Sequence, residues 1–167
     1  MINTTRTRKG QFFSYDAIVA GLMFTVLLTV LYVYWSSLRA TVFTQIDDMF
    51  RTAIGVSNLL LTTGNPIDWS ESNVMQVGLT TRINSLELDT DKVGAFVTMA
   101  TGPGYESMRS KLGVAPYMFY IQIGGIVEAG VQPTPDATGK ITVVRPVIYG
   151  GQASNLTVTI WSNFTSS

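Results

Sequence analysis

One uninterrupted apolar stretch, from Ala17 to Leu38, constrains this chain more than any other feature. It reads AIVAGLMFTVLLTVLYVYWSSL, 22 residues without a charged side chain. A helix of about 20 residues, rising 1.5 Å per residue, crosses the roughly 30 Å hydrocarbon core of a bilayer. A buried helix of a soluble core is the alternative, but such helices seldom run this long without a charge. The stretch therefore predicts a helix that lies in lipid, or in an apolar environment that replaces lipid.

Charged residues on the N-terminal side of this stretch predict its orientation. Arg6, Arg8 and Lys9 precede it, and the first acid, Asp16, comes directly before Ala17. Lysine and arginine beside a first membrane segment hold that side in the cytoplasm, so we expect the C-terminal part outside. A cleaved secretory signal has a shorter apolar core and a small-residue cleavage site, neither of which is present here.

The composition excludes several kinds of chemistry. Of the 167 residues none is Cys or His, and the net charge is zero. Disulfides, thiol nucleophiles, imidazole bases and Cys/His zinc sites are therefore ruled out, and nothing indicates nucleic-acid binding. The acidic residues are scattered among turns and helix starts rather than converging on one site. We expect no enzyme activity, no cofactor and no metal.

A helical pattern continues beyond the apolar stretch. Apolar residues recur at spacings of three and four: Leu38, Val42, Ile46, Met49, Phe50, Ala53, Ile54 and Val56. No proline occurs before Pro66, and Gly64-Asn65-Pro66 is a helix stop. One helix from about Ser14 to Leu61 is predicted, apolar all round in its first half and amphipathic in its second. Two helices with a break near Ser36-Ser37 or Gly55 are the alternative.

Two short helices are expected in the part of the chain after Pro66. The first is predicted to be capped by Thr90 and carries the stripe Val93, Phe96, Val97 and Ala100. The second places Tyr105, Met108 and Leu112 on one face and ends at Gly113. Both stripes indicate core packing. Asp47 and Asp48, in the preceding long helix, point about 100° apart and are expected to be solvated.

Three strands are predicted towards the C-terminus. They cover 117–123, 140–149 and 155–161, and each alternates apolar with polar side chains. Pro146 places the middle one at a sheet edge or a bulge. We expect an antiparallel sheet whose apolar face covers the long helix. The predicted fold class is α+β, a long N-terminal helix packed by a small head of antiparallel strands and two short helices.

The junction before the apolar stretch runs from Arg8 to Asp16 and reads RKGQFFSYD. These residues resemble the class III leader of archaeal type IV pilins. In that family a prepilin peptidase cuts on the cytoplasmic side, after a basic residue and a glycine or alanine, and the apolar segment stays on the mature protein. The resemblance places the cleavage among Lys9, Gly10, Gln11 and Phe12. Two peptide bonds are candidates for the cleavage. The sequence Lys-Gly-Gln slightly favours Gly10–Gln11, whereas a cut at Gln11–Phe12 would make Asp16 the fifth mature residue.

Later segments extend the resemblance over residues 8–123. They are a Gly-x-Pro-x-x-Trp turn from Gly64 to Trp69, Val77-Gly78-Leu79, a helix bearing Lys92, Tyr105, and Leu112-Gly113-Val114 before an aromatic strand. Archaeal pilin-like surface proteins with class III leaders often show these pieces in this order. The resemblance supplies no catalytic residues.

The resemblance implies a structural filament subunit, major or minor, that assembles through its N-terminal helix. Its parts would be a leader over 1–11, a transmembrane and filament-core segment over 12–38, an amphipathic stalk over 39–64 and an extracellular head over 65–167. Its partners would be identical subunits or related pilins, the prepilin peptidase and the membrane. Asp16 would meet the freed amino terminus of a neighbour. A second interpretation, which does not exclude the first, is that Asp16 caps a helix start. The alternative function is a membrane-anchored ectodomain that binds a ligand or partner and keeps its signal anchor.

Two glycosylation sequons lie on the predicted outer side. They begin at Asn155 and Asn163. The strand phase puts Asn155 on the face opposite the core, which suits a sugar. A third match, at Asn3, lies in the predicted cytoplasmic leader and is discounted. Whether such a filament would serve adhesion, motility, DNA uptake or surface contact is left open by the sequence.

Overall fold

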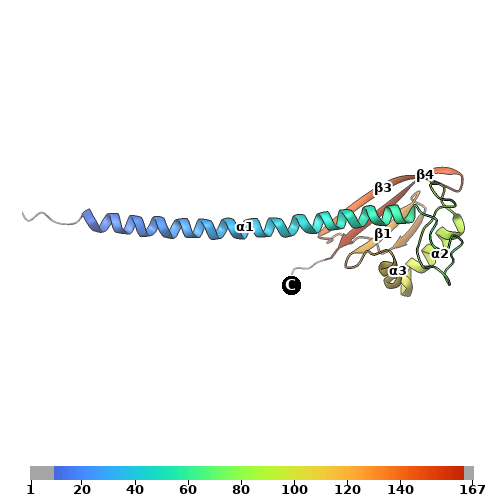
Figure 1. The fold of residues 1–167 in the computed structure, drawn as a ribbon, viewed down its shortest axis with the longest axis horizontal. Helices are drawn as coiled ribbons and strands as arrows, with labels where there is room; N and C mark the ends of the chain where they lie inside the picture. The colour runs from blue at the N-terminus through green and yellow to red at the C-terminus, as the bar shows by residue number, and fades with distance from the viewer. Residues whose placement is uncertain (1–9, 164–167) are drawn as a thin grey trace, which may run out of the picture. The chain divides into compact units, whose positions relative to one another are not determined.

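A computed structural model of the chain describes residues 10–163, apart from the side chains of residues 10–14 and 40–43. The chain divides into two compact units, Met1–Thr44 and Gln45–Ser167. The elements are α1 Gly10–Leu60, α2 Thr90–Ala100, the 3-10 turn η1 Gly102–Gly104, α3 Tyr105–Lys111, β1 Met118–Ile123, β2 Val127–Gly130, β3 Gly139–Tyr149 and β4 Gln152–Ser162 (Figure 1). The predicted α+β fold is confirmed.

The long helix α1 is helical at every residue between Gly10 and Leu60. The alternative of two helices with a break near Ser36-Ser37 or Gly55 is therefore wrong. At its C-terminal end, backbone groups of the following loop satisfy carbonyl oxygens that would otherwise lack donors. The amide of Leu79 donates to the Leu60 oxygen at 2.8 Å, and the amide of Thr80 donates to the Thr62 oxygen at 3.0 Å.

The sheet has four strands in the order β2-β1-β4-β3, and all neighbours are antiparallel. The three predicted strands are present. The fourth, β2, was not predicted and is a correction to the three-stranded sheet. Strand β3 lies at an edge, as Pro146 indicated, because a proline has no amide hydrogen to give to a second neighbour.

Two glycine pairs make both hairpin turns. Gly150 and Gly151 alone join β3 to β4, whereas Gly124 and Gly125, together with Ile126, join β1 to β2. All four have positive φ angles, from 59° to 77°. A two-residue turn whose central residues both have positive φ matches the right-handed twist of the strands, and glycine adopts this conformation without a steric cost.

The core of the second unit lies between α1 and one face of the sheet. The α1 side chains that face it are Met49, Ala53, Val56 and Leu60, each at most 2 % exposed. The sheet contributes alternate residues of β1 and β4, namely Phe119, Ile121, Ile123, Leu156, Val158 and Ile160, each at most 1 % exposed. Figure 1 shows the green part of α1 lying along the strands. Burial of this face, at about 25 cal/mol per Å² of apolar area, holds the end of α1 on the sheet.

The other face of the sheet is not entirely solvated. Trp161 belongs to it by strand phase, yet only 2 % of the residue is exposed. Its indole Nε1 donates to the Val131 carbonyl oxygen at 3.0 Å, and Gln132 Nε2 donates to the Tyr120 hydroxyl at 3.1 Å. The segment that follows β2 thus covers this end of the face. The alternation of the sequence could not reveal this cover.

The short helices pack as predicted, with one correction. In α2, Val93, Phe96 and Ala100 are buried, and in α3, Tyr105 and Met108 are buried. The N-cap of α2 is Asp89 rather than Thr90. The Asp89 side chain accepts hydrogen bonds from the amides of Asp91 and Lys92, and a carboxylate at this position also interacts favourably with the helix dipole.

Candidate functional site

The first candidate site is the surface of α1 in the first unit. From Tyr15 to Trp35, every large apolar or aromatic side chain is between 48 and 74 % exposed. The sequence has no charged residue between Asp16 and Arg39. Among the described residues, this is the one helix long and apolar enough to cross a membrane. An apolar surface of this length in water would be costly, so it requires lipid or other apolar partners.

The hydroxyl groups of this segment are satisfied within the helix. Thr25 Oγ1 donates to the Gly21 carbonyl oxygen and Thr29 Oγ1 to that of Thr25, both at 2.8 Å. Ser36 Oγ donates to the Val33 oxygen at 2.9 Å. Such bonds to the preceding turn hide the polar groups from an apolar environment. The surface therefore behaves as apolar despite its threonines and serines.

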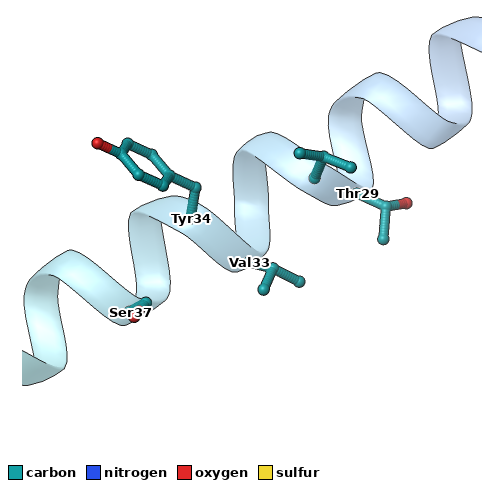
Figure 2. A pocket seen from close by; sticks show the side chains of 5 residues that line it. Thr29, Val33, Tyr34 and Ser37 are labelled. Atoms are coloured by element: carbon teal, nitrogen blue, oxygen red, sulfur yellow. The ribbon is translucent and has the colours of Figure 1, made fainter.

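Small or short side chains recur every fourth residue along this segment, on a line that winds around the helix. The set is Ala17, Gly21, Thr25, Thr29, Val33 and Ser37. Residues four apart differ by only about 40° around a helix, so they form one slowly turning stripe. Figure 2 shows Thr29, Val33 and Ser37 on successive turns, lining a shallow depression with the Tyr34 ring extending outwards. Small-xxx-small stripes let two helix backbones approach closely in an apolar medium.

The predicted cleavage and assembly residues lie at the start of α1. Lys9 is outside the described residues, as are Asn3 and the rest of the leader up to residue 9. Gly10, Gln11 and Phe12 form the first residues of the helix. Asp16 is exposed and lies six residues after the helix start, and the first turn carries no acid. Asp16 therefore does not cap this helix, and its predicted role in assembly remains a prediction.

In the second unit, the head segments that carry the family resemblance contact one another. Trp69 Nε1 donates to the Gly78 carbonyl oxygen at 2.7 Å. Added side chains at Gly64 and Gly78 would collide, because Gly64 lies against the Trp69 ring and Gly78 against the backbone of Gly64 and Thr62. The glycines of both motifs are thus explained by one close packing of loop against loop.

Lys92 connects this loop to the end of α1 through two hydrogen bonds. The residue is 7 % exposed, and its Nζ donates to the carbonyl oxygens of Thr63 at 2.9 Å and Thr80 at 3.1 Å. Thr63 follows the end of α1, where no basic residue occupies the last helical turn. An amino group at this point interacts favourably with the helix dipole. Lys92 thus has a structural role in joining α1, the loop and α2.

Asp47 and Asp48 were expected to be solvated, and each has a partner. Arg51 Nε donates to Asp47 Oδ2 at 2.8 Å on an exposed helix face. The Tyr117 hydroxyl donates to Asp48 Oδ2 at 2.7 Å. Burial of the phenol, followed by this hydrogen bond and the Asp48 charge, raises the pKa of Tyr117 to about 12. The first contact lies within α1, and the second joins α1 to the residue before β1.

Both outer sequons have an exposed asparagine. Asn155 is exposed on β4 while its neighbour Leu156 is fully buried, which agrees with the predicted strand phase. Asn163 is exposed and accepts a hydrogen bond from Thr134 Oγ1 at 3.2 Å. The third residue of its sequon, Thr165, lies outside the described residues. Glycosylation of either asparagine stays a prediction.

Known proteins offer no direct guide to this arrangement. Within residues 10–163, no three His, Cys, Asp or Glu side chains come together in a way that suits a metal ion. The chain matches no protein-family model, no curated protein and no solved structure. Any functional conclusion therefore depends on the physical properties of α1 and on the leader sequence.

Reasoning from the sequence found the apolar segment but missed two features of these sites. The four-residue recurrence of small residues is visible in the sequence and could have been found by testing that spacing. The Tyr117–Asp48 pair could not, because its members are 69 positions apart and meet only once α1 packs on the sheet.

Proposed function

We propose that this protein is a type IV pilin-like subunit of a surface filament, with a structural rather than a catalytic role. The observation that carries the proposal is the exposed, uncharged helical surface between Ala17 and Leu38. The same chain also contains a second unit with a hydrophobic core. Before assembly this surface would lie in the membrane. In the filament, the same surface on neighbouring subunits would replace lipid.

The stripe of small residues suggests how neighbouring helices pack. Lipid tails are as apolar as leucine, so helices associate in lipid through close packing rather than through the hydrophobic effect. A Cβ atom added at Gly21 would meet no other atom within 4 Å. Because their side chains are small, Gly21, Thr25 and Thr29 would lie where helix backbones approach most closely. Larger side chains such as Leu22, Phe24 and Leu31 would fill the wider spaces.

Cleavage of the leader would create a second contact between subunits, from the freed amino group to Asp16. Cleavage after Gly10 or Gln11 frees an amino group five or four residues before Asp16. In a bundle of apolar helices, opposite charges that meet at low dielectric attract strongly, and this attraction offsets part of the cost of removing both from water. Asp16 would then fix the register of a subunit against its neighbour.

The second candidate is a membrane-anchored ectodomain with an uncleaved signal anchor. The basic residues Arg6, Arg8 and Lys9 favour it equally, because they orient either kind of segment with the N-terminus in the cytoplasm. In that case the head would bind a ligand or partner at the cell surface. Only the fate of the leader separates the two candidates.

Mass spectrometry of the N-terminus of the chain recovered from cells tests the proposal. We expect a start at Gln11 or Phe12. Where the start is Gln11, a Gly10→Val variant should keep its leader, because the peptidase family cuts after a small residue. Gly55→Val is the matched control. Gly55 is exposed and has open space around it, so this chain should still be processed. An intact Met1 end on the unaltered chain would favour the anchored ectodomain instead.

A further inference from the structure

We propose that Tyr32, Tyr34 and Trp35 form an aromatic belt that binds the headgroup and glycerol zone of the outer leaflet. The belt would fix where α1 leaves the bilayer. This inference rests on the proposed function only in assuming that the subunit lies in a membrane before assembly. It assigns to these three residues a lipid partner that filament assembly alone does not require.

The distribution of the rings around α1 favours a partner that surrounds the helix over one that docks on a single side. Taking 100° per residue, Tyr34 lies about 160° from Tyr32 and about 100° from Trp35 around the axis. The three residues are 74, 63 and 59 % exposed. A protein partner that docks on one side contacts residues three and four apart. Tyr32 and Trp35 are three residues apart and about 60° from each other, so they share one side, and Tyr34 lies on another side of the same turn. Rings on more than one side suit a partner that surrounds the helix, as the membrane interface does.

The chemistry of this end of the segment is that of an interface. Tyrosine and tryptophan have an apolar ring and one polar group, and they concentrate where acyl chains meet headgroups. Ser36 and Ser37 follow, and then Arg39 supplies the first charge. The guanidinium carbon of Arg39 lies 5.4 Å from the centre of the Trp35 ring. This cation–π contact holds a positive charge beside the belt, at the level of the lipid phosphates.

The distance to the other end of the segment fits a bilayer. Tyr15, which is 74 % exposed, and Asp16 mark the cytoplasmic side. From Tyr15 to Tyr32 a helix rises about 26 Å, and to Tyr34 about 29 Å. The hydrocarbon core is about 30 Å thick. The two aromatic positions therefore bracket one core thickness without a charged residue between Asp16 and Arg39.

Depth-dependent fluorescence quenching tests the belt. The full chain is reconstituted in phosphatidylcholine vesicles whose acyl chains carry bromine either near the glycerol end or near the bilayer centre. Trp35 should be quenched more strongly by the shallow bromines. The only other tryptophans, Trp69 and Trp161, are 4 and 2 % exposed within the head. A Trp35→Phe chain measures their contribution, and the quenching should be lost in it.

A second variant calibrates the depth. In the chain carrying both Trp35→Phe and Leu27→Trp, the indole moves about 12 Å along the helix towards the bilayer centre. This chain should be quenched more strongly by the deep bromines. Position 27 is exposed, so the substitution needs no repacking.

The outcomes distinguish a failure of the aromatic-belt proposal from a failure of the filament proposal. Deep bromines that quench Trp35 more than shallow ones, or no quenching in a chain that floats with the vesicles, would overturn the belt and leave the filament proposal standing. A chain that does not float would overturn the belt together with the membrane-inserted state. Shallow quenching in a chain whose leader stays uncut in cells would support the belt and count against the filament.

Discussion

The hydroxyl of Tyr117 makes the stability of the head depend on pH in the alkaline range. The pKa of Tyr117 is raised from its ordinary value of 10.0 to about 12, first by burial and then by Asp48. A group with a raised pKa stabilises the fold fully below its unfolded pKa and loses this contribution as the pH rises through the folded value. We expect the free energy of unfolding to fall by about 2 kcal/mol between pH 10 and pH 12.

Urea unfolding of the full chain in detergent micelles, followed by tryptophan fluorescence, measures this loss. Tyr117→Phe should unfold more easily at pH 7, by about 1 kcal/mol, because it loses one hydrogen bond to a solvated carboxylate. Above pH 10 the same variant should lose less stability than the unaltered chain. Equal losses in both chains would show that other groups cause the alkaline effect.

The amino group of Lys92 gives a second prediction at this scale. Lys92→Met keeps most of the apolar stem but leaves the carbonyl oxygens of Thr63 and Thr80 without this donor. Both threonines are buried, so the cost should be about 2 to 3 kcal/mol in the same unfolding experiment.

Lys111→Met is the matched control for Lys92. The Lys111 Nζ also donates to a backbone oxygen, that of Val74 at 2.8 Å, but Lys111 is exposed. Water can replace its hydrogen bond, and the loss should stay below about 1 kcal/mol. If both variants lost the same stability, burial would not be what gives Lys92 its importance.

Particular residues show which features could be predicted from the sequence and which could not. The exposed side of β4 at Asn155 followed from strand alternation alone, because this property is local. The partners of Asp48 and Lys92 did not follow, because each pair joins segments far apart in the chain. Asp89 was missed as the cap for a simpler reason: two capping residues stand side by side, and helix boundaries inferred from sequence are uncertain by a residue or more.

Among the elements, the loop between α1 and α2 depends on a glycine contact that can be tested. In Gly78→Ala the new Cβ would meet the Gly64 amide nitrogen and the Thr62 carbonyl oxygen, both backbone atoms that cannot rotate away. The head should lose about 3 kcal/mol of stability. Gly94→Ala in α2 is the matched control, since its Cβ would meet nothing within 4 Å.

The control should behave in the opposite way. Alanine in a helix interior is favoured over glycine by about 0.5 to 1 kcal/mol, so Gly94→Ala should raise the unfolding midpoint. A Gly78→Ala chain as stable as the unaltered one would mean that the loops are not held as closely as the structure describes.

The elements differed in how well the sequence predicted them. The periodic apolar residues of α1 and the alternation of β1, β3 and β4 predicted those elements because each signal is repeated many times. The short strand β2 has only four residues, too few to show alternation. The sequence signal beside it is Gly124-Gly125, a pair that favours a hairpin turn.

For the molecule as a whole, the main functional prediction came from composition rather than from fold. An uncharged surface from Ala17 to Leu38 is recognisable in the sequence because no packed head of this size could bury it. The function of the head could not be predicted in the same way, since the segments that carry the family resemblance pack against one another. Trp69, Gly78 and Lys92 explain how the head holds together and leave its external partners to experiment.

The most direct test of the account is the isolation of filaments sheared from the surface of cells that make this protein. Electron microscopy with an antibody against the head, followed by mass spectrometry of the same fraction, gives two readings of one sample. The account predicts labelled filaments that contain this chain starting at Gln11 or Phe12. A chain found only in the membrane fraction, with Met1 still in place and no labelled filament, would contradict it.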